Sequence, residues 1–201
     1  KLAGMQPQRK QIIDLLDWYL NQLLKLKVEI KLNTLIDSNF IKKFSADVTI
    51  IATGSYPNNS LFQKAIPHVD KLPGIDLGNI FSAEDVMSSS TNLGKKILIL
   101  DEGGNWKGCG TAWKLAEEGY DVTLITPDPF VGKELQRTAA DYPLRQKLSK
   151  LGVSFILESA ITKWKKGSAE IICFLDGKPQ TIEAKSLVYA TTNIAKNSLS
   201  L

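Results

Sequence analysis

The chain has 201 residues, of which 43% are hydrophobic and 23% are charged, so its composition predicts a globular protein with a buried core rather than a disordered one. No apolar run approaches the roughly 20 residues that span a bilayer, and a net charge of +4 is too small and too scattered to indicate a nucleic-acid partner. The sequence shows no export leader, which favours a cytoplasmic location, and because it begins at Lys1 we expect a piece of a longer protein.

The first part of the chain, residues 1–66, predicts a small α/β unit. Apolar residues at helical spacing indicate a helix over 8–26. The alternating segment 28–32 and the mostly apolar segment 47–52 predict two strands, the second of the kind that is covered on both faces in a parallel sheet. Prolines and a serine run over 67–94 indicate a linker.

The second part, residues 95–201, alternates strands and helices and therefore predicts a Rossmann-like parallel sheet. The expected elements are a strand at 97–100, a helix at 108–118 that stops at Gly119, a strand at 122–125, a helix from Pro143 to Leu151, a strand at 153–157, a small antiparallel meander over 160–184 and a strand at 187–190.

The two parts resemble each other. Residues 46–61 can be laid over residues 184–199 without a gap, and 25–30 echoes 150–155. This similarity predicts two related α/β units, of which only the second keeps a strand, a glycine loop and a helix in sequence. The alternative is a chance similarity between two buried strands.

The glycine-rich stretch after the strand at 97–100 has the arrangement that binds a dinucleotide. Glycines let the backbone approach a pyrophosphate, and a helix N-terminus offers free N–H groups to it. Gly103, Gly104 and Gly108 are the candidate glycines of this loop. Lys107 is expected either to meet a phosphate as a point charge or to be solvated.

Three features argue against tight binding at this loop. It is about two residues longer than the usual G-x-G-x-x-G fingerprint, and Trp106 places a bulky side chain where a phosphate should be cradled. Thr126 stands where an acidic residue would hold a ribose, and Asp128 comes two positions late. We favour a retained fold with a weakened or lost site, and tight nucleotide binding is the alternative.

The cysteines and the only histidine assign no catalytic or metal site. Cys109 and Cys173 form no C-x-x-C motif, so they are expected to be free buried thiols, with a single disulfide as the alternative. His68 is expected on a surface loop with no nucleophile beside it. No residue is therefore assigned as catalytic or as a metal ligand.

Three segments of the chain resemble one known family. They are Leu-Asp-Glu-Gly-Gly-Asn-Trp-Lys-Gly-Cys-Gly-Thr-Ala at 100–112, Ile-Ala-Thr-Gly-Ser-Tyr-Pro at 51–57, and the segment 142–153. Together they resemble the carboxy-terminal half of the NADH:flavin oxidoreductases that include 2,4-dienoyl-CoA reductase and trimethylamine dehydrogenase. The Asp-Glu-x-Gly-x-Trp-x-Gly form of the loop is closer to the amine dehydrogenase and N-demethylase branch.

This resemblance implies a glutathione-reductase-type pair of FAD/NAD(P)-binding domains behind an amino-terminal TIM barrel that carries FMN and an iron–sulfur cluster. In the reductase branch these domains hold FAD and take hydride from NAD(P)H. In the amine dehydrogenase branch the FAD-like place holds ADP, and the other domain uses no nicotinamide. The cofactor-binding residues implied for this chain are Ala52, Thr53, Gly54, Gly103, Gly104, Trp106, Lys107 and Gly108.

We therefore expect an α/β chain with a truncated FAD/ADP-type domain at 1–66, a linker at 67–94 and an NAD(P)-type Rossmann-like domain at 95–201. The leading hypothesis is the nucleotide-domain region of a flavin-dependent oxidoreductase, inactive alone and binding no FMN, FAD or other nucleotide tightly. Its partners would be the missing amino-terminal barrel and an electron-transfer protein.

Two alternatives stay open. The first is an NAD(P)H-binding domain that delivers hydride to FAD, as in 2,4-dienoyl-CoA reductase. The second is a non-enzymatic docking module, with Lys163, Lys165 and Lys166 facing an acidic electron-transfer partner.

Overall fold

A five-stranded parallel sheet forms the centre of the structure, a computed structural model that describes residues 1–88 and 91–199. Its strand order is β2-β9-β3-β4-β5. The strands are β2 (Ile80–Ser82), β9 (Ser186–Ala190), β3 (Lys96–Asp101), β4 (Asp121–Ile125) and β5 (Ser154–Ile156). Strands β9 and β3 lie in the middle and are almost entirely buried, as their nearly continuous apolar sequences predict.

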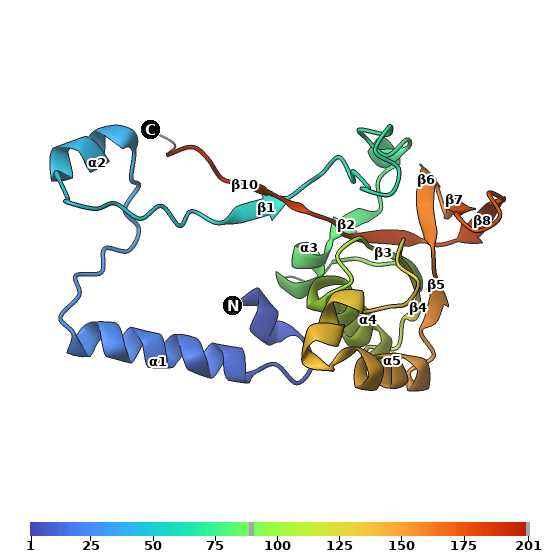
Figure 1. Cartoon of the computed structure of the whole chain (residues 1–201), viewed down its shortest axis with the longest axis horizontal. Helices are drawn as coiled ribbons and strands as arrows, with labels where there is room; N and C mark the ends of the chain where they lie inside the picture. The colour runs from blue at the N-terminus through green and yellow to red at the C-terminus, as the bar shows by residue number, and fades with distance from the viewer. Residues whose placement is uncertain (89–90, 200–201) are drawn as a thin grey trace.

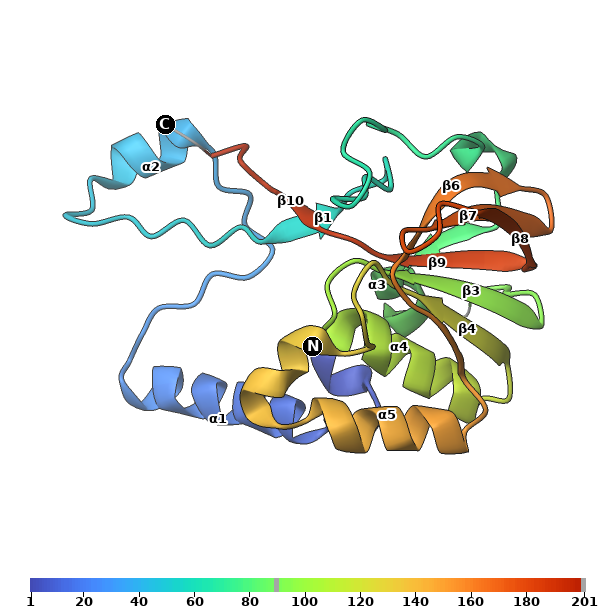
Figure 2. The ribbon, with the colours of Figure 1, turned by 45° about the vertical axis from the view of Figure 1, so that its right-hand side comes forward.

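The two faces of this sheet are covered by different layers. Helices α3 (Ala83–Ser88), α4 (Trp106–Glu117) and α5 (Asp141–Lys150) lie on one face, and the meander β6 (Ser159–Lys165), β7 (Ser168–Cys173) and β8 (Pro179–Glu183) lies on the other (Figure 2). Because side chains alternate along a strand, Ile97 and Ile99 pack with the helices, whereas Leu98 and Leu100 pack with Trp164 of the meander. These layers confirm the expected fold class of the second unit.

Local sequence signals set the ends of the helices. The Asn105 side chain accepts a hydrogen bond from the Lys107 N–H at 2.9 Å, so α4 begins at Trp106, two residues earlier than the sequence predicts. Gly119 adopts the left-handed conformation, φ +84°, and ends the helix as expected. Pro143 lies in the first turn of α5, also as predicted.

Part of the expected linker 67–94 is built into the sheet. Strand β2 pairs in parallel with β9, and α3 follows it directly. Ser82 and Asp85 cap α3 reciprocally, since Asp85 accepts from the Ser82 N–H at 2.8 Å and its own N–H donates to Ser82 Oγ at 3.0 Å. A short 3-10 turn, η2 (Ile75–Leu77), precedes β2. The domain boundaries themselves stay a prediction.

In the amino-terminal part, η1 (Leu2–Met5) packs beside α3, whereas α1 (Gln11–Lys25) and α2 (Ser38–Phe44) extend away from the sheet (Figure 1). The helix predicted over 8–26 is confirmed, but the strands predicted at 28–32 and 47–52 are wrong: neither segment forms a strand. Val48 and Ile50 are 77% and 86% exposed. A strand needs a neighbour to satisfy its backbone groups, and these two segments have none among the described residues.

A two-stranded ribbon joins β1 (Ser55–Pro57) and β10 (Asn193–Ala195), which lie in the two segments matched by the predicted repeat. Residues 55–57 and 193–195 occupy equivalent places in the two matched segments, and they pair antiparallel with Tyr56 opposite Ile194. Only the central pair, Tyr56 and Ile194, joins equivalent residues, because Ser55 faces Ala195 and Pro57 faces Asn193. The repeat itself stays a prediction. This ribbon connects the amino-terminal part to the sheet (Figures 1 and 2).

Candidate functional site

A cleft of about 480 Å³ lies at the carboxyl ends of β3, β4 and β9. Between β3 and β9 the sheet order reverses direction along the chain, and open α/β sheets bind their ligands at such a switch point. The cleft is lined from three sides. The loop and helix after β3 contribute Gly103 and Lys107, and the segment after β4 contributes Asp128 and Lys133. Thr191, which directly follows β9, lines the third side.

The glycine loop keeps the spacing of the G-x-G-x-x-G fingerprint, so the prediction that it is about two residues longer is wrong. Strand β3 extends to Asp101, which leaves 102–105 as the loop before α4. Counted back from Gly108, Gly103 and Asn105 hold the first and third places of the G-x-G-x-x-G fingerprint. The second glycine of that fingerprint, which lets the backbone approach a pyrophosphate, is therefore an asparagine here.

Asp101 occupies the interior of this loop. Its side chain is fully buried, and Oδ1 accepts hydrogen bonds from the N–H groups of Gly103 at 3.2 Å and Gly104 at 3.1 Å. Cys109 Sγ donates to Oδ2 at 3.5 Å. Two amides that a phosphate-binding loop would turn toward its ligand are thus satisfied by the chain's own carboxylate.

Gly108 is required where Asp101 meets α4. A Cβ atom at position 108 would lie 2.4 Å from Asp101 Cγ, so only glycine lets the helix pass over this side chain. Close helix-to-strand packing is the usual role of the third glycine in a dinucleotide-binding loop. In this chain that glycine makes room for a buried acid.

Burial changes the ionisation of the groups under the loop. It raises the pKa of Asp101 from 3.8 to about 7, although the loop hydrogen bonds oppose the shift. Burial also raises the pKa of Glu102, and it raises the pKa of the Cys109 thiol well above its ordinary value. Cys109 is therefore a neutral thiol and not a nucleophile at neutral pH.

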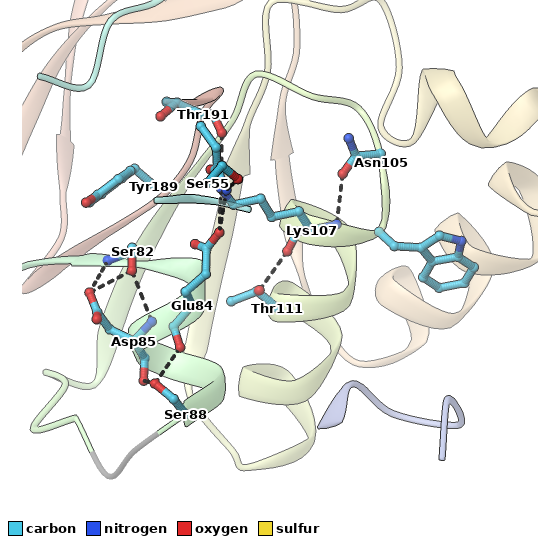
Figure 3. Close-up of polar contacts among 12 residues, drawn as sticks. Ser55, Ser82, Glu84, Asp85, Ser88, Asn105, Lys107, Thr111, Tyr189 and Thr191 are labelled. Carbon is cyan, nitrogen blue, oxygen red and sulfur yellow. Dashed lines mark hydrogen bonds and ion pairs between the residues drawn. The ribbon is translucent and has the colours of Figure 1, made fainter. Parts of the chain in front are cut away.

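The Lys107 ammonium group contacts several other groups of the chain (Figure 3). Its ammonium group lies 2.9 Å from Glu84 Oε1 of α3 and donates to the Thr191 carbonyl at 3.1 Å. It also donates to Asn193 Oδ1 at 2.7 Å, and Asn193 Nδ2 donates to Ser55 Oγ at 3.1 Å. One lysine therefore joins α4, α3 and the β1–β10 ribbon.

Trp106 does not narrow the cleft. Its ring lies under the Arg9 guanidinium, 4.4 Å from the ring centroid, and lines smaller cavities on the amino-terminal side of α4. Gln6 Nε2 donates to the Trp106 carbonyl at 2.7 Å. The indole thus packs α4 against the start of the chain, and it is not among the residues that line the cleft.

The segment after β4 folds over the glycine loop. Glu134 donates its backbone N–H to the Gly104 carbonyl at 2.9 Å, at the start of the 3-10 helix η3 (Lys133–Thr138). Asp128 lies beside Gly104 and forms an ion pair with Lys133, with 2.9 Å between Oδ1 and Nζ. The acid nearest to the place of a ribose-binding residue is thus engaged by a lysine.

The three flavin-side candidates lie elsewhere. Ala52, Thr53 and Gly54 are exposed and precede β1. Thr53 Oγ1 donates to the Lys196 carbonyl at 2.6 Å, and the Lys196 N–H donates to the Gly54 carbonyl at 3.0 Å. Of the predicted residues, Gly103 and Lys107 line the cleft, Gly104 and Gly108 belong to the adjoining loop and helix, and these three lie apart from it. That any of the eight residues binds a cofactor stays a prediction.

The remaining predictions about reactive residues concern thiols, metals and membranes. Cys109 is buried, Cys173 is half-buried and both are free thiols; His68 is exposed. Within residues 1–88 and 91–199, no three histidine, cysteine or acidic side chains are placed to share a metal ion. Over the same residues, no helix has the length and apolar character needed to cross a membrane.

The strand order, the loop after β3 and the helix at the switch point define a Rossmann-type nucleotide-binding domain. Residues 9–199 match the pyridine nucleotide-disulphide oxidoreductase family, and the chain belongs to that family.

Two sequence relatives narrow the comparison. The chain is 29% identical over 172 residues to a probable N-methylproline demethylase of Rhizobium meliloti, covering 86% of this chain and 24% of that protein. It is 39% identical over 111 residues to a cinnamate reductase of Clostridium sporogenes, covering 55% of this chain and 15% of that protein. The chain thus spans a quarter or less of the length of these curated relatives.

Solved structures agree over nearly the whole chain. A 6-hydroxypseudooxynicotine amine oxidase from Pseudomonas geniculata superposes with a TM-score of 0.90 at 21% identity, covering 98% of this chain and 29% of that one. A 2-naphthoyl-CoA reductase superposes with a TM-score of 0.81 at 26% identity, covering 99% and 28%. These comparisons confirm the resemblance drawn from the sequence and the fold class.

Sequence reasoning missed the residues that occupy the site. From the sequence, Asp101 is only the residue at the end of an apolar strand. Its side chain bonds to the loop because the amides of Gly103 and Gly104 turn toward it. Glu84 lies in the expected linker, so nothing in the sequence pairs it with Lys107. An acid directly before a glycine loop is the one signal that could have indicated the internal contact.

Proposed function

We propose that this chain is the nucleotide-domain region of a larger flavin-dependent oxidoreductase of the amine dehydrogenase and demethylase branch. In this role it is a scaffold that binds nucleotide weakly at most. Family membership and the named relatives support the oxidoreductase class; among them is an N,N-dimethylglycine/sarcosine dehydrogenase of Chromohalobacter salexigens, 32% identical over 127 residues. That relative is matched over 63% of this chain and 18% of its own length.

One observation carries the weak-binding part of the proposal. The groups in the cleft that would hold a diphosphate are already engaged: the Gly103 and Gly104 amides by Asp101, and the Lys107 ammonium by Glu84. A nucleotide must break these contacts before it gains its own. The family to which the chain belongs implies NAD(P) binding, but the residues of this cleft do not fit that cofactor. We therefore derive no hydride transfer at this cleft.

The rest of the larger protein belongs to the same proposal. The resemblance implies FMN and an iron–sulfur cluster on an amino-terminal barrel, with FAD or ADP beside Ala52, Thr53 and Gly54. In support, α1 has no buried residue, and its apolar side chains are exposed, as they would be if another part of the protein covered them. The barrel is then the principal partner of this chain.

Calorimetric titration of the chain with NADH, NADPH and ADP tests the proposal. We expect heats too small to fit for all three, which corresponds to Kd values above about 1 mM. Saturable binding of any of them at micromolar concentration would contradict it. Binding of ADP alone would place an adenine site on this chain without nicotinamide use.

The second candidate is an NAD(P)H-binding domain that delivers hydride to FAD. The retained positions of Gly103 and Gly108 favour it, as does a similarity of 26% over 193 residues to an NADH oxidase of Thermoanaerobacter brockii, covering 94% of this chain and 28% of that one. It requires NADH to bind more tightly than ADP in the same titration. The docking hypothesis is weakened at one position, because Lys165 pairs with Glu170 on the meander.

A further inference from the structure

We infer that Asp101 is the residue that excludes dinucleotides from the cleft, acting as an internal anion in place of a bound diphosphate. The inference rests on the proposed function, because it explains why a retained Rossmann loop binds nucleotide weakly. It assigns the exclusion to one buried side chain rather than to the shape of the loop or the general charge of the cleft.

The geometry of the loop is the first support. A diphosphate at a Rossmann loop is recognised by backbone N–H groups that point toward the ligand. Here the N–H groups of Gly103 and Gly104 point to Asp101 Oδ1 at 3.2 and 3.1 Å, under the loop. A dinucleotide could recruit these amides only if the carboxylate left them.

The packing around Asp101 is the second support. The carboxylate is sealed by α4, since Gly108 has no space for a Cβ and Cys109 Sγ lies 3.5 Å from Oδ2. The side chain is fully buried, so no solvent-exposed conformation of the acid is available without moving the helix. The acid is therefore built into the fold, and not a flexible residue that a ligand could push aside.

Charge is the third support. A carboxylate directly behind the loop repels a diphosphate through the low-dielectric interior. At the rim, Asp128 is paired with Lys133 and Lys107 with Glu84. Lys64 lies beside Glu102, so the rim charges largely offset one another. Removing the charge at 101 should thus change affinity more than removing a charge at the rim.

Two substitutions separate the charge from the hydrogen bonds. Asp101→Asn keeps the shape and one acceptor oxygen but removes the charge, and Asp101→Ala also frees the two amides. With NAD⁺ as the probe in calorimetry, we expect the Asn variant to bind about tenfold more tightly than the wild type, and the Ala variant more tightly again. Thermal melts establish that each variant is folded.

Glu102→Gln is the matched control. This residue follows Asp101 in the chain and lines the cleft, but it does not take the loop amides; instead Oε2 accepts from the Lys64 N–H at 3.0 Å. We expect its NAD⁺ affinity to change by less than about twofold. An equal gain in Glu102→Gln and Asp101→Asn would overturn the inference, because general charge would then explain the exclusion.

The wild-type chain offers a test that needs no substitution. The diphosphate diester of NAD⁺ does not change its charge between pH 6 and 8, whereas Asp101 takes up a proton in this range. The groups that face Asp101 are Cys109 of α4, which stays a neutral thiol, and Asp128 of the segment after β4. We expect NAD⁺ to bind more tightly at pH 6 than at pH 8, and this difference to persist in Glu102→Gln but vanish in Asp101→Asn.

The outcomes separate this inference from the proposed function. Micromolar NAD⁺ binding by the wild type at pH 8 would contradict the proposed function. It would also contradict this inference, because no residue would then be excluding the dinucleotide. Weak binding by the wild type, by both Asp101 variants and at pH 6 would leave the proposed function intact and overturn the inference. A gain confined to the Asp101 variants and to low pH supports both.

Discussion

At the scale of single residues, the site is determined by an acid that the fold buries beside a glycine loop. Asp101 gains hydrogen bonds from two amides and a thiol, but it loses hydration of its charged form, and its pKa rises to about 7. A buried acid of this kind reduces stability while it is charged. Its place at the end of β3, with its oxygen bound to two loop amides, therefore favours a role in shaping the loop over a role in stabilising the domain.

Replacing this acid should change how stability depends on pH. Because the pKa of Asp101 is raised from 3.8 to about 7 in the folded state, the folded chain binds more protons than the unfolded chain between these values. The free energy of unfolding should then fall as pH rises through this window, by up to about 1.4 kcal/mol per pH unit. In urea unfolding from pH 4 to 8, the free energy of unfolding of the wild type minus that of Asp101→Asn should therefore fall as pH rises.

One result of this comparison would contradict the account. If Asp101→Asn were less stable than the wild type at pH 8, the charged acid would be a net stabilising group, and burial would not control its titration.

At the scale of elements, Lys107 fixes α4 to α3 and to the β1–β10 ribbon. Glu84, Thr191 and Asn193 all contact its ammonium group, and they come from three different segments of the chain. The ribbon itself is short and exposed, so it depends on such contacts for its position. The lysine therefore ties α4 to α3 and to the β1–β10 ribbon.

Replacing Lys107 with methionine should loosen this tie. Lys107→Met leaves the Glu84 carboxylate and the Thr191 carbonyl without their cation, so we expect the free energy of unfolding to fall by about 1–3 kcal/mol. Amide hydrogen exchange at Tyr56 and Ile194 in the ribbon should also become faster.

Lys71→Met is the matched control for this change. Lys71 pairs with Asp76 at 3.3 Å, but both side chains are more than half exposed, so its loss should cost less than about 1 kcal/mol. Equal losses of stability in the two variants would contradict the structural role of Lys107.

At the scale of the whole molecule, a well-covered sheet carries an amino-terminal part whose apolar side chains are uncovered. Leu24 and Ile50 are both largely exposed, whereas β3 and β9 are almost entirely buried. Yet the whole chain, including this part, superposes on solved oxidoreductase structures that are more than three times as long as the matched region. This agreement supports the proposal that the uncovered surface faces other parts of a larger protein.

The strands of the sheet could be predicted from the sequence, but the side-chain contacts that fill the site could not, for physical reasons. Continuous apolar runs and the stop at Gly119 identify β3, α4 and β9, because these signals are local. The strand predicted at 47–52 fails because pairing depends on a neighbour that the local pattern does not specify. Likewise, the contact of Lys107 with Glu84 joins residues far apart in the chain, and no local rule brings them together.

The central claim is that the chain's own side chains occupy the phosphate-binding groups of a retained Rossmann loop. The most direct measurement is the backbone amide spectrum of the ¹⁵N-labelled chain, followed at the Gly103 and Gly104 resonances during titration with NADH at pH 8. We predict that both resonances stay in place, because Asp101 holds their N–H groups. Saturable shifts of both amides at micromolar NADH would contradict the claim.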